Sequence, residues 1–176
     1  IEIDISEEVL NGAWEALIDD RVELLIGASA PVPIQKGVSV QTIAMNEMAF
    51  YVNKNHPLLS YPAPLSDQNI AHFVTVVVHD SAKTVIPKSV GIIENSQHLY
   101  VASLDHKIKA IISGLGCGFL PKKRAQSYVQ NGQLIALETE HVKQPDELYI
   151  AWKFVNRGKG LQRLRELLLN ANLAGV

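Results

Sequence analysis

The chain has 176 residues, of which 47% are hydrophobic, 19% charged and 6% aromatic, and its formal net charge is −2. This size allows one compact domain or two small lobes, and the hydrophobic content excludes a disordered chain. No apolar run approaches the ~20 residues that span a bilayer, and the balance of 16 basic and 18 acidic residues argues against a nucleic-acid surface built from charge alone.

The first part of the chain predicts a strand, a helix and a second strand. Residues 1–5 alternate apolar and acidic, as in a strand with one buried face. Ser6 is a candidate helix cap, and Asp19 lies where the apolar helical spacing ends. A short strand over 22–26, closed by Gly27, follows. Short connections between such elements indicate a βαβ unit with parallel strands.

The middle of the chain predicts one or two strands over 38–52 and an irregular stretch over 53–67 that holds three prolines. We expect this stretch to cross between two lobes. Ser66 is placed to start a short helix. The β-branched run at 73–78 is typical of a strand that is buried on both faces.

Strands and helices continue to alternate up to the C-terminus. Further strands are predicted at 97–102, 114–121, 134–137 and 148–155, and helices after Ser103, at 122–129 and at 161–173. This alternation predicts an α/β fold. A second polar loop near 138–147 would return the chain to the first lobe, so we expect one subdomain from 1–55 and 146–176 and another from 56–145.

The sequence offers no recognisable catalytic or metal site. It has no GxSxG, HExxH, Walker or kinase motif, and its six histidines show no paired metal spacing. Gly114, Gly116 and Gly118 follow a predicted helix and enter a strand, which is the reverse of a phosphate-binding loop. Cys117 has no acid or histidine beside it, so we expect neither a nucleophile nor a cofactor. A single cysteine also fits a reducing compartment.

The polar trio His79, Asp80 and Ser81 is the better candidate for ligand binding. It follows the most buried strand, and ligands of open α/β sheets bind beyond the carboxyl ends of strands. Ser103, at a helix N-terminus, could place a hydroxyl and free amides beside a small anion, or could only cap its helix. Ser6 could likewise bind a small anion or only cap its helix. These residues favour a small polar or anionic ligand.

Four segments together resemble the effector-binding domain of LysR-type transcriptional regulators. They are GAWEALIDDRVELLIGA (12–28), YVNKNHPLLSYPAPLS (51–66), GLGCGFLPKKRAQSYVQNGQL (114–134) and LYIAWKFVNRGKGLQRLRELL (148–168). The resemblance implies a type 2 periplasmic-binding-protein-like fold, in which two Rossmann-like subdomains are joined by two crossover segments and an effector binds between them. In the family a strand and helix precede the segment that matches Ile1, and we expect this first βα unit outside the chain.

The resemblance also implies partners and site residues. One wall of the effector site would include Ser6, Leu10 and Asn11. The other would include His79, Asp80 and Ser81, with Ser103 and the Gly116-Cys117 backbone nearby. The family implies a cytoplasmic homodimer or higher homo-oligomer that reads promoter DNA through an N-terminal winged helix-turn-helix domain absent from this chain, with no membrane partner.

Two other functions remain open from the sequence. A periplasmic solute-binding protein that feeds a transporter shares the expected fold, and the upstream sequence would discriminate. A helix-turn-helix there supports the regulator, and a secretory signal supports the transport protein. An enzyme is the third candidate, but no acid–base pair or nucleophile arrangement supports it.

Overall fold

The computed structural model describes residues 2–34 and 36–171 and divides into two units. Unit 1 comprises Asp80–Lys88 with the described residues of the ranges 1–46 and 146–176, and unit 2 comprises Glu47–His79 and Ser89–Pro145. The boundaries differ from those expected from the sequence, because 47–55 belongs to unit 2 and 80–88 belongs to unit 1.

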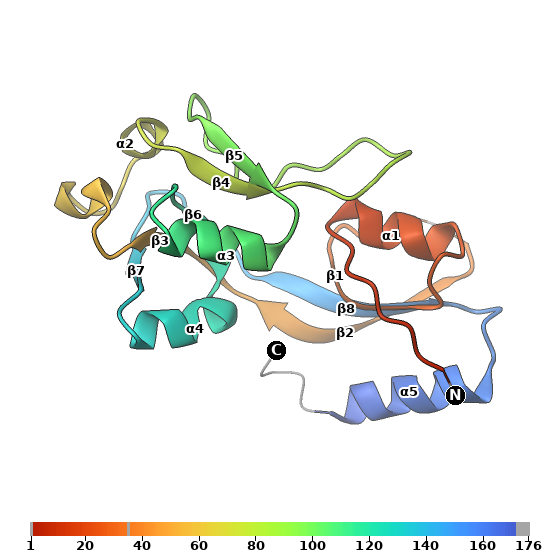
Figure 1. Cartoon of the computed structure of the whole chain (residues 1–176). Coiled ribbons are helices and arrows are strands. Elements are labelled where there is room, and N and C mark those ends of the chain that lie inside the picture. Colours follow the sequence, from red (N-terminus) through yellow and green to blue (C-terminus); the bar gives the residue numbers. More distant parts are fainter. Residues whose placement is uncertain (1, 35, 172–176) are drawn as a thin grey trace. The chain divides into compact units, whose positions relative to one another are not determined.

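Each unit combines helices and strands (Figure 1). Unit 1 contains α1 (Asn11–Ile18), β1 (Leu24–Ser29), β2 (Val38–Asn46), β8 (Asp146–Lys153) and α5 (Lys159–Asn170). Unit 2 contains β3 (Met48–Asn53), η1 (Pro57–Ser60), α2 (Asp67–Ala71), β4 (Thr75–Val78), β5 (His98–Val101), α3 (Leu104–Ile112), β6 (Gly118–Pro121), α4 (Lys122–Gln130) and β7 (Leu134–Leu137).

Unit 1 is built on an antiparallel sheet in the order β1-β8-β2. Ala151 of the central strand pairs with Leu25 on one side and with Val40 on the other. The predicted parallel βαβ unit is therefore wrong. The strand predicted at 22–26 overlaps β1, but its partner is β8, which lies more than a hundred residues further along the chain.

Two helices flank this sheet, α1 on one side and α5 on the other (Figure 1). Trp14 and Leu17 of α1 pack with Leu25 and Ala151, because alternate strand residues share one face. Trp152 therefore points to the opposite face, where the Arg165 guanidinium of α5 lies 4.3 Å from the ring centroid.

Three details at the start of unit 1 correct the sequence prediction. Residues 2–9 form no strand, and Ile3 and Ile5 are exposed because no strand pairs with them in the described chain. Helix α1 begins at Asn11 instead of near Ser6, which lies in exposed coil. Gly27 does not close β1 but lies within it, at a bulge in the pairing with β8 and with φ of 80°.

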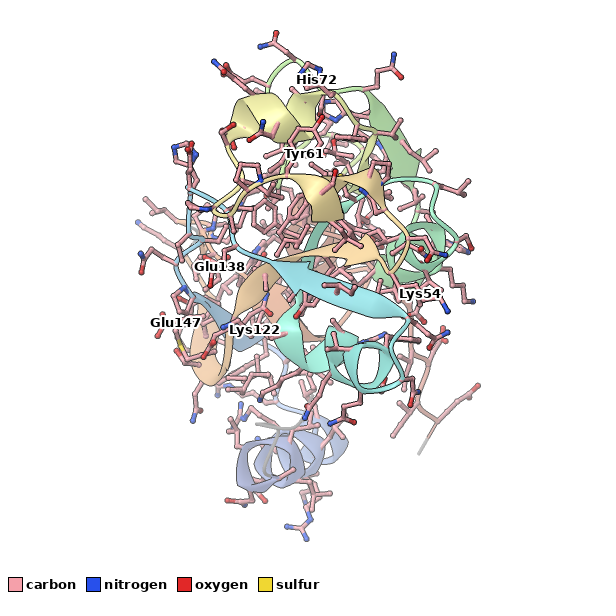
Figure 2. The ribbon with its side chains drawn as sticks, turned by 90° about the vertical axis from the view of Figure 1, so that its left-hand side faces the viewer. Lys54, Tyr61, His72, Lys122, Glu138 and Glu147 are labelled. Carbon is pink, nitrogen blue, oxygen red and sulfur yellow. The ribbon has the colours of Figure 1, made fainter. Side chains whose placement is uncertain are left out.

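Unit 2 has an antiparallel sheet, β6-β3-β7, and a parallel pair, β4-β5. Phe50 and Phe119 meet edge to face in its core, with ring centroids 5.2 Å apart. Tyr61, which Figure 2 labels after η1, packs against Phe73 with ring centroids 6.0 Å apart. Lys122, which Figure 2 labels at the start of α4, forms an ion pair with Glu47 at 2.9 Å.

Local signals located the helix starts of unit 2 well. Ser66 forms a capping box with Asn69 at α2, and Ser103 accepts a hydrogen bond from the His106 backbone at α3, as predicted. The stretch 53–67, expected to cross between lobes, is instead η1 and its flanking turns within unit 2. Its prolines fit these turns.

Gly116 is required by the close approach of the β6 segment to β4. A Cβ at Gly116 would lie 2.5 Å from the Val74 carbonyl oxygen, so Gly116→Ala should destabilise the chain by roughly 1–3 kcal/mol. Gly158→Ala is the matched control, because nothing lies within 4 Å of that Cβ. Urea unfolding of both variants checks this, and equal stability of the two would contradict it.

Candidate functional site

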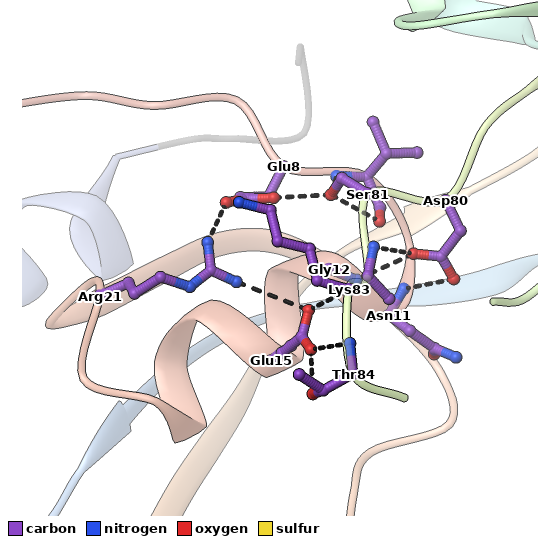
Figure 3. A network of polar contacts seen from close by, with 11 residues as sticks. Glu8, Asn11, Gly12, Glu15, Arg21, Asp80, Ser81, Lys83 and Thr84 are labelled. Carbon is purple, nitrogen blue, oxygen red and sulfur yellow. Dashed lines mark hydrogen bonds and ion pairs between the residues drawn. The ribbon is translucent and has the colours of Figure 1, made fainter. Parts of the chain in front are cut away.

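The carboxylate of Asp80 joins the segment 80–88 to the N-terminus of α1 (Figure 3). It accepts hydrogen bonds from the backbone N–H of Asn11 (3.3 Å) and Gly12 (3.0 Å), the first two residues of the helix. It also accepts from the backbone N–H of Ala82 (2.9 Å) and Lys88 (2.6 Å). A negative charge here satisfies amides that a helix leaves unpaired and complements the helix dipole.

Ser81 ties the same segment to the chain before α1. Its hydroxyl donates to Glu8 Oε2 at 2.6 Å and accepts from the Val9 backbone N–H at 2.8 Å. The other oxygen of Glu8 binds the Arg21 guanidinium at 2.6 Å. The hydrogen bond from Ser81, together with Arg21, lowers the pKa of Glu8 below its ordinary value.

Glu15 is a buried carboxylate that completes this network (Figure 3). It accepts from the Thr84 hydroxyl, from the backbone N–H of Lys83 at 2.7 Å and from the backbone N–H of Thr84 at 2.6 Å. These hydrogen bonds, led by that of the Thr84 hydroxyl, lower the pKa of Glu15 to about 2. Arg21 Nη2 lies 3.7 Å away. Glu15 is therefore a fixed anion.

The predicted residues of this region thus fall into two groups. Asn11, Asp80 and Ser81 come together in unit 1, and the Asn11 side chain also donates to the Ile86 carbonyl at 3.1 Å. Leu10 lies next to them, with φ of 52° at the helix N-cap. Ser6 is apart from the network in exposed coil. The carboxylate of Asp80 and the hydroxyl of Ser81 make hydrogen bonds within the protein. The spacing of these residues along the sequence did not indicate those contacts.

The remaining predicted residues belong to unit 2. His79 is exposed beyond β4, and its ring stacks on Tyr100 with centroids 4.6 Å apart. Ser103 caps α3, so its capping reading is confirmed, and its hydroxyl also lies 3.1 Å from His106 Nδ1. An open hollow of about 410 Å³ lies between β5 and α3. It is lined by Leu99, Val101, Ala102, His106, Lys109, Ala110, Ser113 and Leu115.

Gly116 and Cys117 are buried structural residues next to β4. The Cys117 backbone N–H donates to the Val74 carbonyl at 3.0 Å, and its carbonyl accepts from Val76 N–H at 2.8 Å. Burial raises the pKa of the Cys117 thiol to about 12, so the thiolate needed for nucleophilic attack does not form near neutral pH.

Lys107 is a buried cation that sequence reasoning missed. Only 5% of this α3 residue is exposed, and burial, with the like charge of Lys143, lowers its pKa to about 8. The signal was present in the sequence, because Lys107 falls on the apolar face with Leu104 and Ile108 at helical spacing. A charged residue on such a face is a candidate for function.

The residues 2–34 and 36–171 contain no group of three or more His, Cys, Asp or Glu that could hold a metal ion. No helix within the described chain is both long and apolar enough to cross a membrane.

The buried carboxylate gives a pH prediction. Since the pKa of Glu15 is about 2 in the folded chain and 4.5 ordinarily, its contribution to stability is complete above about pH 4.5 and is lost as the pH falls towards 2. Glu15→Gln should therefore be less stable than the parent at pH 6 and differ less at pH 3. Urea unfolding across this range checks it, and a difference that is constant with pH would contradict it.

The buried lysine gives a prediction of opposite sign. Because the folded chain favours the neutral amine, the penalty is complete below about pH 8 and disappears towards pH 10.5. Lys107→Met should stabilise the chain at pH 7 by roughly 1–3 kcal/mol. Lys109→Met, at an exposed position of the same helix, should stay within about 0.5 kcal/mol of the parent. A destabilised Lys107→Met chain would contradict this account.

Comparisons with known proteins agree with the resemblance seen in the sequence. The model of the LysR substrate binding domain matches residues 1–172. The regulator PunR of Escherichia coli K12 is 27% identical over 168 residues, covering 96% of this chain and 54% of PunR. The activator AllS of Salmonella typhimurium is 23% identical, covering 92% of this chain and 53% of AllS. The chain spans about half the length of the curated relatives it matches.

Solved structures are similar in fold. The regulatory domain of MetR from N. meningitidis, a LysR family regulator, superposes with a TM-score of 0.63 and 16% identity, covering 89% of this chain and 72% of that one. The CrgA regulatory domain from Neisseria meningitidis gives 0.65 and 15%, covering 89% and 78%. These matches confirm the predicted α/β class. The chain belongs to the LysR substrate-binding domain family.

Proposed function

We propose that this chain is the effector-sensing part of a transcriptional regulator. The family match over 172 residues carries the proposal, and the curated relatives PunR and AllS are both regulators, which supports it over the transport-protein alternative. The whole protein would bind promoter DNA through a winged helix-turn-helix domain outside this chain, act in the cytoplasm and form a homodimer or higher homo-oligomer. No catalytic step is proposed.

The effector is proposed to be a small polar or anionic metabolite. Candidate contacts in unit 2 are the exposed His79 and the Ser103 hydroxyl, whereas the amides at the N-terminus of α1 in unit 1 already bind Asp80. A ligand acts on a regulator only through different affinities for its states. The segment 80–88 is a suitable element for such a response, because polar contacts through Asp80 and Ser81 hold it against α1.

The binding step is tested by thermal unfolding of the chain in a panel of small carboxylic acids, amino acids and sugar phosphates. A ligand that binds only the folded chain must raise its Tm, and the rise grows with the logarithm of the ligand concentration once this exceeds the Kd. His79→Ala should weaken such binding about tenfold if the ring donates a hydrogen bond to the ligand. His72→Ala, at another exposed histidine of unit 2, should leave it unchanged.

The regulatory step needs the longer natural protein. Its affinity for its own upstream promoter fragment, measured with and without the ligand from the panel, should change with the ligand. A secretory signal in place of a helix-turn-helix upstream, or promoter binding that no ligand of this chain alters, would overturn the proposal.

A further inference from the structure

His56 is a buried histidine whose ring binds the backbone of unit 2. Only 9% of the residue is exposed. Its Nδ1 accepts a hydrogen bond from the Leu58 backbone N–H at 3.2 Å, which makes His56 the N-cap of η1. A ring nitrogen that accepts a hydrogen bond carries no proton, so the ring is neutral and holds its single proton on Nε2. The cap therefore fixes both the tautomer and the charge of His56.

The sequence around His56 directs its ring to this one amide. Pro57 follows and has no N–H, so the Leu58 amide is the first donor of η1. Pro57 also favours the extended backbone of His56, which has φ of −71° and ψ of 137°. Leu58 itself is fully buried in a core cluster with Phe50 and Ile70. Loss of the cap would therefore disturb a residue that anchors η1 in the core.

Phe73 contacts aromatic rings from both ends of η1. Its ring centroid lies 5.0 Å from that of His56, before η1, and 6.0 Å from that of Tyr61, after η1. An aromatic ring beside a histidine can favour the charged imidazolium through a cation–π interaction. Burial nevertheless lowers the pKa of His56 below its ordinary value of 6.5. The cost of enclosing the charge is therefore the larger effect.

The described surroundings of the ring supply no counter-charge. Three parts of unit 2 adjoin the ring, namely the turn after β3, η1 itself, and α2 with its connection to β4. Their titratable residues are Lys54, Tyr61, Asp67 and His72. Burial alone shifts the pKa of His56, and within residues 2–34 and 36–171 its ring forms no ion pair. An imidazolium here would be an unpaired charge.

We propose that His56 is a pH-sensitive switch that opens η1 when the chain is acidified. In the closed state the neutral ring caps η1 through Nδ1. A proton on Nδ1 would face the Leu58 N–H, and two donors cannot bind each other, so protonation and capping exclude each other. The switch goes beyond the sensor function, because it requires no effector.

The pH range of the switch follows from the direction of the pKa shift. Above about pH 6.5 the ring is neutral in the folded and the unfolded chain, so it costs no stability. As the pH falls below 6.5, the unfolded chain takes up the proton first, and the folded chain loses stability relative to it. The loss is complete below the lowered pKa of the folded chain.

NMR of the unmodified chain tests both states. At pH 7.5 the His56 ring should carry its proton on Nε2 alone. Between pH 7.5 and pH 5 the protection of the Leu58 amide against hydrogen exchange should fall about 3- to 30-fold, as expected for loss of a helix cap. The Val76 amide, which donates to the Cys117 carbonyl at 2.8 Å, is the internal control and should keep its protection. A proton on Nδ1 at pH 7.5, or constant Leu58 protection down to pH 5, would overturn the proposal.

Two histidine variants give a second test. His56→Asn keeps a side-chain oxygen that can cap η1 and removes the titrating ring. In urea unfolding from pH 8 to pH 5.5, the parent should lose stability relative to His56→Asn, because only the parent has to keep this ring neutral. His72→Asn, at an exposed histidine, should follow the parent at every pH.

A stability difference between the parent and His56→Asn that is the same at every pH would also overturn the proposal. The NMR experiment uses no variant, so it decides the question even if the His56→Asn chain does not fold.

Discussion

One carboxylate organises the N-terminal part of unit 1. Asp80 accepts hydrogen bonds from four backbone amides, two in the first turn of α1 and two in its own segment. The contacts of Ser81 and Glu15 rely on this placement, because they require the chain after Asp80 to run along α1. Gly12 allows that approach, since a Cβ there would lie 1.9 Å from the Ser81 hydroxyl oxygen. Helix start, glycine and segment thus form one cooperative unit.

Sequence reasoning succeeded where the cause of structure is local. Ser66 and Ser103 cap α2 and α3, and β7 spans the predicted 134–137, because these signals lie within a few residues. It failed where the partner is distant. The N-cap of α1 was assigned to Ser6, but the carboxylate that serves it belongs to Asp80, 68 positions after Gly12. The antiparallel pairing of β1 with β8 is equally non-local.

The candidate site shows the same division. The position of Asp80 after a buried strand suggested ligand binding, and the role seen in the structure is a contact within the protein. Lys107 was readable in principle, because one charge interrupts an apolar helix face.

The environment therefore favours the charged form of a buried group in unit 1 and disfavours it in unit 2. In unit 1 the carboxylates of Glu15 and Asp80 are fully partnered by the chain, which makes them structural. In unit 2 the Lys107 ammonium is buried at a cost to stability, because burial favours its neutral form. The most direct measurement is an NMR titration of the Glu15 and Lys107 side chains in the folded chain. The account predicts a pKa of about 2 for Glu15, because hydrogen bonds favour its charged form, and of about 8 for Lys107, because burial favours its neutral form. Ordinary pKa values, near 4.5 for Glu15 and near 10.5 for Lys107, would contradict it.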